Sequence, residues 1–122
     1  MNRPEGDQLN SLLLGRFPQF RAGYEDLLAW RKDPGTHLVF SSLFTPHVIA
    51  LLETGAESNT ELSKAFAFVE ELAQSEASGV REVLVESVLD SLVEEPRWIR
   101  SAWPFMGEKT RSFVQAIAKA SS

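Results

Sequence analysis

The stretch REVLVESVLDSLVEEP, residues 81–96, constrains the fold more than any other part of the chain. Acidic residues recur in it at every fourth position: Glu82, Glu86, Asp90 and Glu94. Because successive residues of an α-helix rotate by about 100°, these four carboxylates form one strip about 120° wide. We call it the acidic strip. Apolar residues fill nearly all the other positions, which is typical of a helix surrounded by protein. The pattern predicts a central helix over 80–94, stopped by Pro96 and exposed only along the acidic strip.

The acidic strip needs an explanation, since like charges four residues apart weaken a helix by about 0.2–0.5 kcal/mol per pair. Three interpretations are available: a solvated face, a metal or acid/base site, and a docking surface for a basic partner. Catalysis by paired carboxylates requires groups that converge in a cleft, whereas these carboxylates stand in a row. The row therefore favours either a solvated face or a docking surface.

Composition narrows the class of protein. The chain has 122 residues, of which 43% are hydrophobic, and this suits one globular domain spanning 1–122. It contains no cysteine, which excludes disulfides and thiolate metal sites and fits a reducing compartment. The net charge of -5 disfavours nucleic acid as the main partner, because phosphate contacts require basic side chains.

The N-terminal segment MNRPEGDQLN is polar, and no apolar region of the signal-peptide kind follows it. The longest apolar runs, such as Val48–Leu52, are far shorter than the roughly 20 residues that cross a bilayer. We therefore expect a cytoplasmic protein without a membrane partner.

Turn and cap residues divide the chain into helices. Asp7 is placed to cap the first helix, Thr45–Pro46 to open another, and Gly55 to end it. The DPG triplet at 33–35 is a strong stop. The predicted helices cover residues 8–15, 19–32, 46–54, 60–75, 80–94, the segment RWIRSAW at 97–103, and a last helix from Gly107 or Glu108 to Lys119.

The segment THLVFSSLF at 36–44 is ambiguous, because it is rich in β-branched and aromatic residues. One isolated strand would have no partner, so a helical turn or an extended connector is favoured. The fold class that follows is all-α: one irregular bundle of six or seven helices, in which HEAT-like pairing of helix hairpins is one arrangement. No internal repeat of fixed period is present.

Motifs for catalysis are missing from the sequence. His37 and His47 lie ten residues apart without the spacing of metal ligands, and no Glu-x-x-His pair accompanies them. No G-x-S-x-G elbow and no glycine-rich phosphate loop occurs. We therefore predict no enzyme activity, no metal, no cofactor and no catalytic residue. A small hydrolase or metal-dependent enzyme would need a polar pocket that contains His37 or His47.

The stretch EEPRWIRSAWPFMGEKTR, residues 94–111, is aromatic and basic. Trp98 and Trp103 fit two roles, anchoring a short helix to the core or binding a partner. Arg97 can pair with Glu94, or with Glu95 if the turn after Pro96 folds back. A basic aromatic patch beside an acidic helix suits protein recognition, so Arg97 and Trp98 are candidate partner-binding residues.

Three segments carry a family resemblance: FAFVEEL at 66–72, VREVLVESVLDSL at 80–92 and MGEKTRSF at 106–113. Together they resemble small helical bacterial proteins with an F-x-F-[VI]-E-x-L helix, a second V/L-rich helix and an MG-x-x-T helix start. Some of these proteins resemble immunity proteins of polymorphic toxin systems, of the Rhs and contact-dependent inhibition kinds.

The resemblance implies a helical protein that binds and neutralises a cognate toxin without catalysing a reaction. An acidic inhibitor can imitate a phosphate backbone in the basic cleft of a toxin that acts on nucleic acid. The predicted partner-binding residues are those of the acidic strip, with Glu70 and Glu71 on the neighbouring helix. The alternative is a helical adaptor that binds a partner protein in an apolar groove, independently of charge.

Overall fold

The computed structural model describes residues 4–31, 34–54 and 59–121, and the side chains of 8–31, 34–54 and 59–120. Within these ranges the chain forms seven helices and no strand, which confirms the all-α prediction. Five helices are α1 (Pro4–Arg16), α2 (Arg21–Trp30), α5 (Asn59–Ala73), α8 (Pro96–Ala102) and α9 (Glu108–Ser121). Short 3₁₀ turns, η1 (Pro18–Phe20) and η5 (Trp103–Phe105), precede α2 and follow α8.

The other two helices are composite, because each contains a π-helical segment. One consists of α3 (Thr36–Val39), η2 (Phe40–Phe44) and α4 (Thr45–Thr54). The other consists of α6 (Ser78–Val83), η4 (Leu84–Leu89) and α7 (Asp90–Val93).

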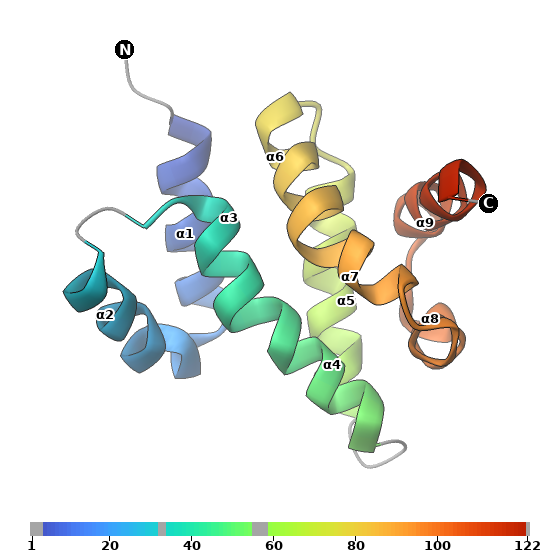
Figure 1. Cartoon of the computed structure of the whole chain (residues 1–122), viewed down its shortest axis with the longest axis horizontal. Coiled ribbons are helices and arrows are strands. Elements are labelled where there is room, and N and C mark those ends of the chain that lie inside the picture. Colours follow the sequence, from blue (N-terminus) through green and yellow to red (C-terminus); the bar gives the residue numbers. More distant parts are fainter. Residues whose placement is uncertain (1–3, 32–33, 55–58, 122) are drawn as a thin grey trace.

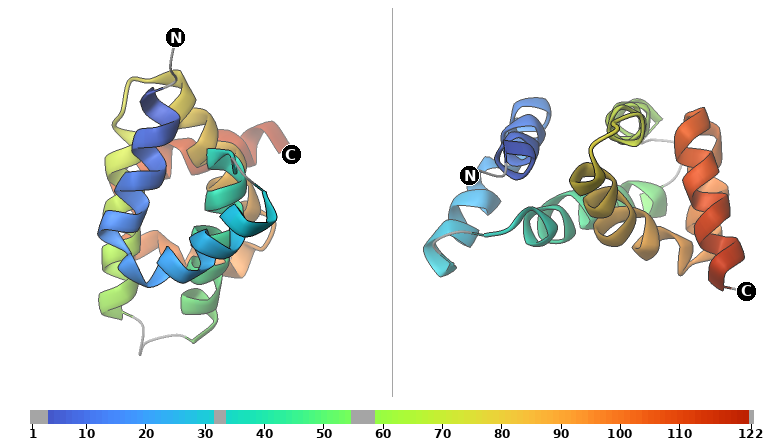
Figure 2. Two further views of the ribbon diagram at one scale, coloured as in Figure 1. Left: turned by 90° about the vertical axis from the view of Figure 1, so that its left-hand side faces the viewer. Right: turned by 90° about the horizontal axis from the view of Figure 1, so that it is seen from above.

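The helices follow one another across the molecule. Figure 1 shows α1 and α2 at one end and α8 and α9 at the other, with the two composite helices and α5 between them. In the view from above, α1 and α5 lie in one layer and the two composite helices in a second layer (Figure 2). Along the chain, α1, the first composite helix, α5 and the second composite helix belong to the two layers in turn. Helix α5 packs against both composite helices.

Four phenylalanine rings join the two layers at the centre of the core. Phe17, Phe44 and Phe68 contact one another edge to face, with ring centroids 5.5–5.6 Å apart. Phe40 lies beside Phe44 and Phe68. All four rings are buried, and edge-to-face contacts of this kind add to the stabilisation from burial alone. The cluster ties the end of α1 to η2 and α5.

The apolar face predicted for the helix at 60–75 is confirmed. In α5 the buried side chains are Leu62, Ala65, Phe66, Phe68, Val69, Leu72 and Ala73. Their spacing of three and four residues places them on one side of the helix. The faces of such regular helices depend on local sequence alone, which explains why this prediction succeeds.

The predicted helix start at Thr45–Pro46 is wrong, because one helix continues through it from Thr36 to Thr54. Thr45 has helical φ and ψ angles, and its N–H bonds to the carbonyl of Phe40, five residues back. Its hydroxyl donates to the Ser87 carbonyl at 2.5 Å, on the other composite helix. Pro46 has no N–H to donate, and the π segment directly before it takes up the resulting break in the α-helical pattern. The segment 36–44 is thus helical and not extended.

Two other predicted boundaries need correction. The first helix begins at Pro4, so Asp7 lies inside it and is not its cap. The second helix ends at Trp30 and does not reach residue 32. Of the DPG stop at 33–35, the first residue lies outside the described residues. Gly55, the expected end of the helix at 46–54, also lies outside them.

Candidate functional site

The composite helix α6–η4–α7 lies at the centre of the bundle. It contacts α1 and α5 through α6, η2 and α9 through η4, and α8 and α9 through α7. Its buried side chains are Val80, Val83, Leu84, Ser87, Val88, Leu89 and Leu92. The four residues of the acidic strip are all exposed. The acidic positions of this helix are therefore exposed and most of its apolar positions are buried, as its sequence pattern predicts.

The π segment η4 within this helix was not predicted. At its end the N–H of Asp90 donates to the carbonyl of Val85, five residues back. A π turn takes up an extra residue, so the regular rotation of 100° per residue does not hold from Leu84 to Leu89. The acidic residues on both sides of this segment are nevertheless exposed. The strip thus remains available to solvent although the helix is irregular beneath it.

The carboxylates of the acidic strip have no partner among the residues that the structure describes. No described cation lies within ion-pair distance of them, and no described side chain or N–H bonds to them. The nearby Arg81 donates instead to the Ser75 carbonyl at 2.9 Å. Exposed carboxylates without internal partners keep their full charge for an approaching molecule.

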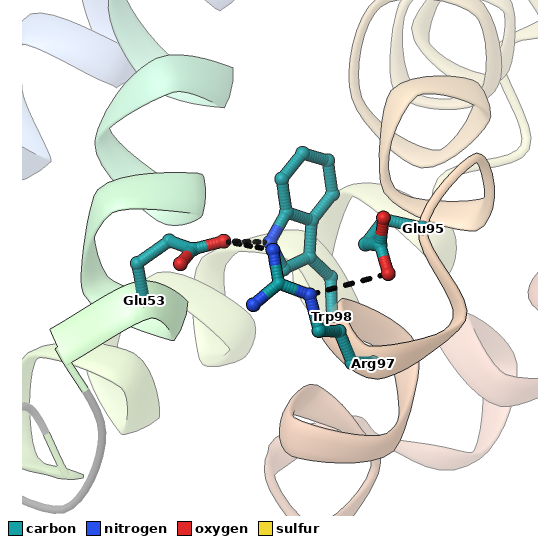
Figure 3. A network of polar contacts seen from close by, with 4 residues as sticks. All are labelled: Glu53, Glu95, Arg97 and Trp98. Atoms are coloured by element: carbon teal, nitrogen blue, oxygen red, sulfur yellow. Dashed lines mark hydrogen bonds and ion pairs between the residues drawn. The ribbon is translucent and has the colours of Figure 1, made fainter.

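Arg97 and Trp98 are held by a carboxylate that the sequence did not single out. The Arg97 Nη2 atom lies 3.1 Å from Glu53 Oε2, and Trp98 Nε1 donates to the same oxygen at 2.5 Å. Figure 3 shows dashed lines that run from this oxygen, near the end of α4, to both the guanidinium and the indole. Arg97 also pairs with Glu95 at 3.2 Å, which realises one of its two predicted pairings.

The contacts of Trp98 leave little of its side chain available to bind a partner. Its ring is half-buried and packs against the core, while its N–H is occupied by Glu53. Glu53 lies 45 residues away in sequence, and no local pattern distinguishes it from any other exposed glutamate. The Glu53–Arg97–Trp98 cluster joins α4 to α8 and gives these two candidate residues a structural function.

Glu70 serves as a cap for the last helix. Its Oε1 accepts from the N–H of Thr110 at 2.9 Å and from the Thr110 hydroxyl at 2.8 Å. Its Oε2 accepts from the N–H of Lys109 at 3.1 Å and from Gln74 at 3.1 Å. Partial burial raises the pKa of Glu70, but the hydrogen bonds from Thr110, Gln74 and Lys109 together outweigh it and lower the pKa below 4.5. Both oxygens are therefore engaged inside the protein, and we leave Glu70 out of the docking surface.

Gly107 makes this cap possible. A Cβ atom at this position would overlap the carboxyl group of Glu70 and lie 2.6 Å from its Cγ. The Gly107 carbonyl accepts the first bond of α9, from the Arg111 N–H at 3.0 Å. The glycine and the threonine of MGEKT thus meet the first glutamate of FVEEL. Two of the segments that carry the family resemblance are joined in space by this contact.

Glu71, the next residue, contacts α1, whereas Glu70 contacts α9. Its carboxylate pairs with Arg16 of α1 at 2.7 and 2.9 Å. The hydrogen bond and the charge of Glu71 raise the pKa of Arg16. Both side chains are about half exposed, so solvent screens the pair and it contributes little to stability. Glu71 is therefore neutralised locally and is not part of the acidic strip.

The two histidines lie in different surroundings. His37 Nδ1 is 2.9 Å from Ser87 Oγ, while His47 lies against the rings of Phe17 and Phe20. A serine beside a histidine is the smallest nucleophilic arrangement, but Ser87 is only 4% exposed and no carboxylate among the described residues bonds to His37. The described residues also contain no group of three or more His, Asp or Glu side chains arranged to hold a metal.

Comparison with protein families places the chain in one of them. A family model described as a domain of unknown function, DUF7674, matches residues 10–119, which is most of the chain. The chain belongs to the DUF7674 family. No curated protein and no solved structure matches it. The DUF7674 match includes the acidic strip, the Glu53 cluster and the Glu70 cap. Among its described helices, none has the length and apolar character needed to span a membrane.

Proposed function

We propose that this DUF7674 domain is a non-enzymatic immunity protein that binds and neutralises a cognate bacterial toxin. The observation that carries the proposal is the acidic strip. Glu82, Glu86, Asp90 and Glu94 are exposed and lack partners within the described residues, while the rest of their helix is mostly buried. The sequence resemblance to immunity proteins supports the same role.

The physical basis is a row of negative charges on a fixed backbone. The acidic residues recur every four positions, so successive members of the strip lie roughly one helical turn apart along the axis. Because the opposite side of the helix is packed in the core, the protein orders no further backbone on binding. A basic cleft that binds a phosphate backbone suits such a row, and long-range attraction speeds the encounter. In this role the protein acts in the cytoplasm, where the toxin's targets are.

Co-expression tests the proposal. A neighbouring gene for a large secreted protein with a variable C-terminal domain would supply the toxin to test, and its absence would count against the proposal. Cells that express this domain should survive only with the immunity protein. The double variant Glu86→Lys/Asp90→Lys should lose this protection. The matched control is Glu25→Lys/Asp26→Lys, which makes the same charge change at exposed positions of α2. Death despite the unaltered protein, or equal protection by both variants, would refute the role of the acidic strip.

One observation favours a second function, that of a helical adaptor. Trp30 and Leu28 of α2 are 74% and 39% exposed, and tryptophan is enriched at binding hot spots. An adaptor of this kind would lose its partner on Trp30→Ala and would keep it on reversal of the acidic strip or in raised salt. The two functions thus make opposite predictions for the same pair of variants.

A further inference from the structure

A pocket of about 420 Å³ lies between α1 and α2, at the end of the molecule farthest from α8 and α9 (Figure 1). It is lined by Asn10, Ser11, Leu14 and Gly15 of α1 and by Arg21 and Tyr24 of α2. The buried rings of Phe17 and Phe20, stacked with centroids 5.6 Å apart, fix the corner between the two helices. The walls of the pocket are therefore held in place by the core.

The polar groups of this pocket have no partners within the described chain. The amide of Asn10, the hydroxyls of Ser11 and Tyr24 and the guanidinium of Arg21 form no hydrogen bond or ion pair with any described side chain or carbonyl. The Oδ1 atom of Asn10 is buried and has no hydrogen-bond partner. Buried polar atoms without a partner are rare in folded proteins, because they lose their bonds to water without replacement. Several uncommitted polar groups around one concavity are typical of a ligand site.

The chemistry of the lining indicates the class of ligand. Arg21 supplies a positive charge, the lining contains no acidic residue, and Ser11 and Tyr24 supply hydroxyl donors, so the pocket favours an anion. Asn10 also lines the pocket, but its Oδ1 atom is buried and is not open to a ligand. Leu14 forms an apolar wall, and the half-exposed Leu28 follows Tyr24 by one helical turn.

We propose that this pocket binds the free carboxylate end of a peptide. The terminal carboxylate pairs with Arg21 and accepts hydrogen bonds from the hydroxyls of Ser11 and Tyr24. An apolar last side chain packs on Leu14. A guanidinium binds a carboxylate through two parallel hydrogen bonds, which makes a free terminus a better ligand than an amidated one. This site is separate from the acidic strip and does not depend on the proposed immunity function.

Nuclear magnetic resonance titration of the whole protein tests the proposal, with acetyl-Gly-Leu as the probe and acetyl-Gly-Leu-amide as its matched control. We expect the acid to shift backbone amide signals of the pocket residues with a Kd of about 1 mM, and the amide to bind about tenfold more weakly or worse. Arg21→Gln should weaken binding of the acid by about tenfold. Arg31 is an exposed arginine outside the pocket, and Arg31→Gln should leave binding of the acid unchanged.

Three outcomes would overturn the proposal. They are equal binding of acid and amide, equal binding to the unaltered protein and the Arg21→Gln variant, and no shift at the pocket at probe concentrations of about 10 mM. Arg21 is exposed and has no internal partner in the described chain, so its replacement should leave the helical circular dichroism unchanged. If the spectrum of Arg21→Gln does change, Tyr24→Phe takes its place as the test. It removes one hydroxyl donor and should weaken binding of the acid but not binding of the amide.

Discussion

The carboxylate of Glu70 caps helix α9 through Thr110, accepting the backbone N–H at 2.9 Å and the hydroxyl at 2.8 Å. Thr110 is fully buried, and 40 residues separate it from Glu70 in sequence. The N-terminus of a helix carries unpaired N–H groups and a partial positive charge, so a carboxylate is well suited to it. This contact fixes α9 to α5 and explains why a glutamate and an MG-x-x-T helix start occur together in the chain.

Removing this cap should destabilise the protein. We expect Glu70→Ala to lower the free energy of unfolding by about 1–2 kcal/mol, as for other lost helix caps, and Glu70→Gln to cost less because its amide oxygen still accepts. Urea unfolding measures the change. The neighbouring Glu71→Ala removes only an exposed, solvent-screened ion pair and should cost clearly less than Glu70→Ala. Equal costs at the two positions would contradict the capping role.

Gly107→Ala should act through Glu70. The added methyl group displaces the carboxylate from the helix terminus, so the substitution should cost about as much as losing the cap, about 1–2 kcal/mol. In a Glu70→Ala background the same substitution should cost clearly less, because no carboxylate remains to be displaced. A double-mutant cycle by urea unfolding measures this coupling. Additive costs would show that Gly107 serves the turn alone.

The Glu53 cluster should contribute to the packing of α8. Glu53→Ala leaves the Trp98 N–H without its acceptor and Arg97 with Glu95 alone. We expect a loss of about 1–2 kcal/mol, the value of a hydrogen bond to a charged group with a small addition from the exposed ion pair. In a Trp98→Phe background, where the N–H is absent, the same change should cost less. An unchanged cost in that background would show that the indole bond contributes nothing.

His47 should make stability depend on pH. Burial lowers its pKa below 6.5, and the charge of Glu61 opposes this shift while that of Lys64 supports it. As pH falls below about 6.5, the unfolded chain takes up a proton at His47 before the folded protein does. The free energy of unfolding should therefore fall through this window. His47→Phe should remove that slope, measured by urea unfolding at successive pH values, and retention of the slope would contradict the assignment.

A second loss should follow at lower pH. The pKa of Glu70 is lowered below 4.5 in the folded state, so its cap stabilises the protein above that pH. This contribution disappears as the pH falls through the folded-state pKa of Glu70. The loss at His47 begins near pH 6.5 and the loss at Glu70 begins near pH 4.5, the ordinary pKa of each group. His47→Phe should therefore remove the loss that begins at higher pH, and Glu70→Ala the loss that begins at lower pH.

Local patterns predicted the all-α class and the buried face of α5, because three- and four-residue spacing is contained within each segment. Both the buried face of α5 and the exposure of the acidic strip follow from such spacing. The two π segments could not be predicted in this way. The contact between Thr45 and the Ser87 carbonyl joins residues 42 positions apart, and it ties the start of α4 to η4.

The adjacent residues Glu70 and Glu71 show how far the contacts of the candidate site can be predicted from sequence. They have the same side chain and neighbouring positions, yet one caps α9 and the other pairs with Arg16 of α1. Their partners are decided by which helices pack on each side of α5, and that information is not in the spacing of the charges. For the same reason Glu53 was not identified, although it holds both Arg97 and Trp98.

The central claim is that the acidic strip binds a basic toxin surface. Calorimetric titration with the toxin domain against which the protein protects cells in the co-expression test checks this claim most directly. We expect a tight complex that weakens as salt is raised, a loss of at least about tenfold in affinity for Glu86→Lys/Asp90→Lys, and little change for Glu25→Lys/Asp26→Lys. Failure to form a complex, or the same affinity for both double variants at every salt concentration, would contradict the claim.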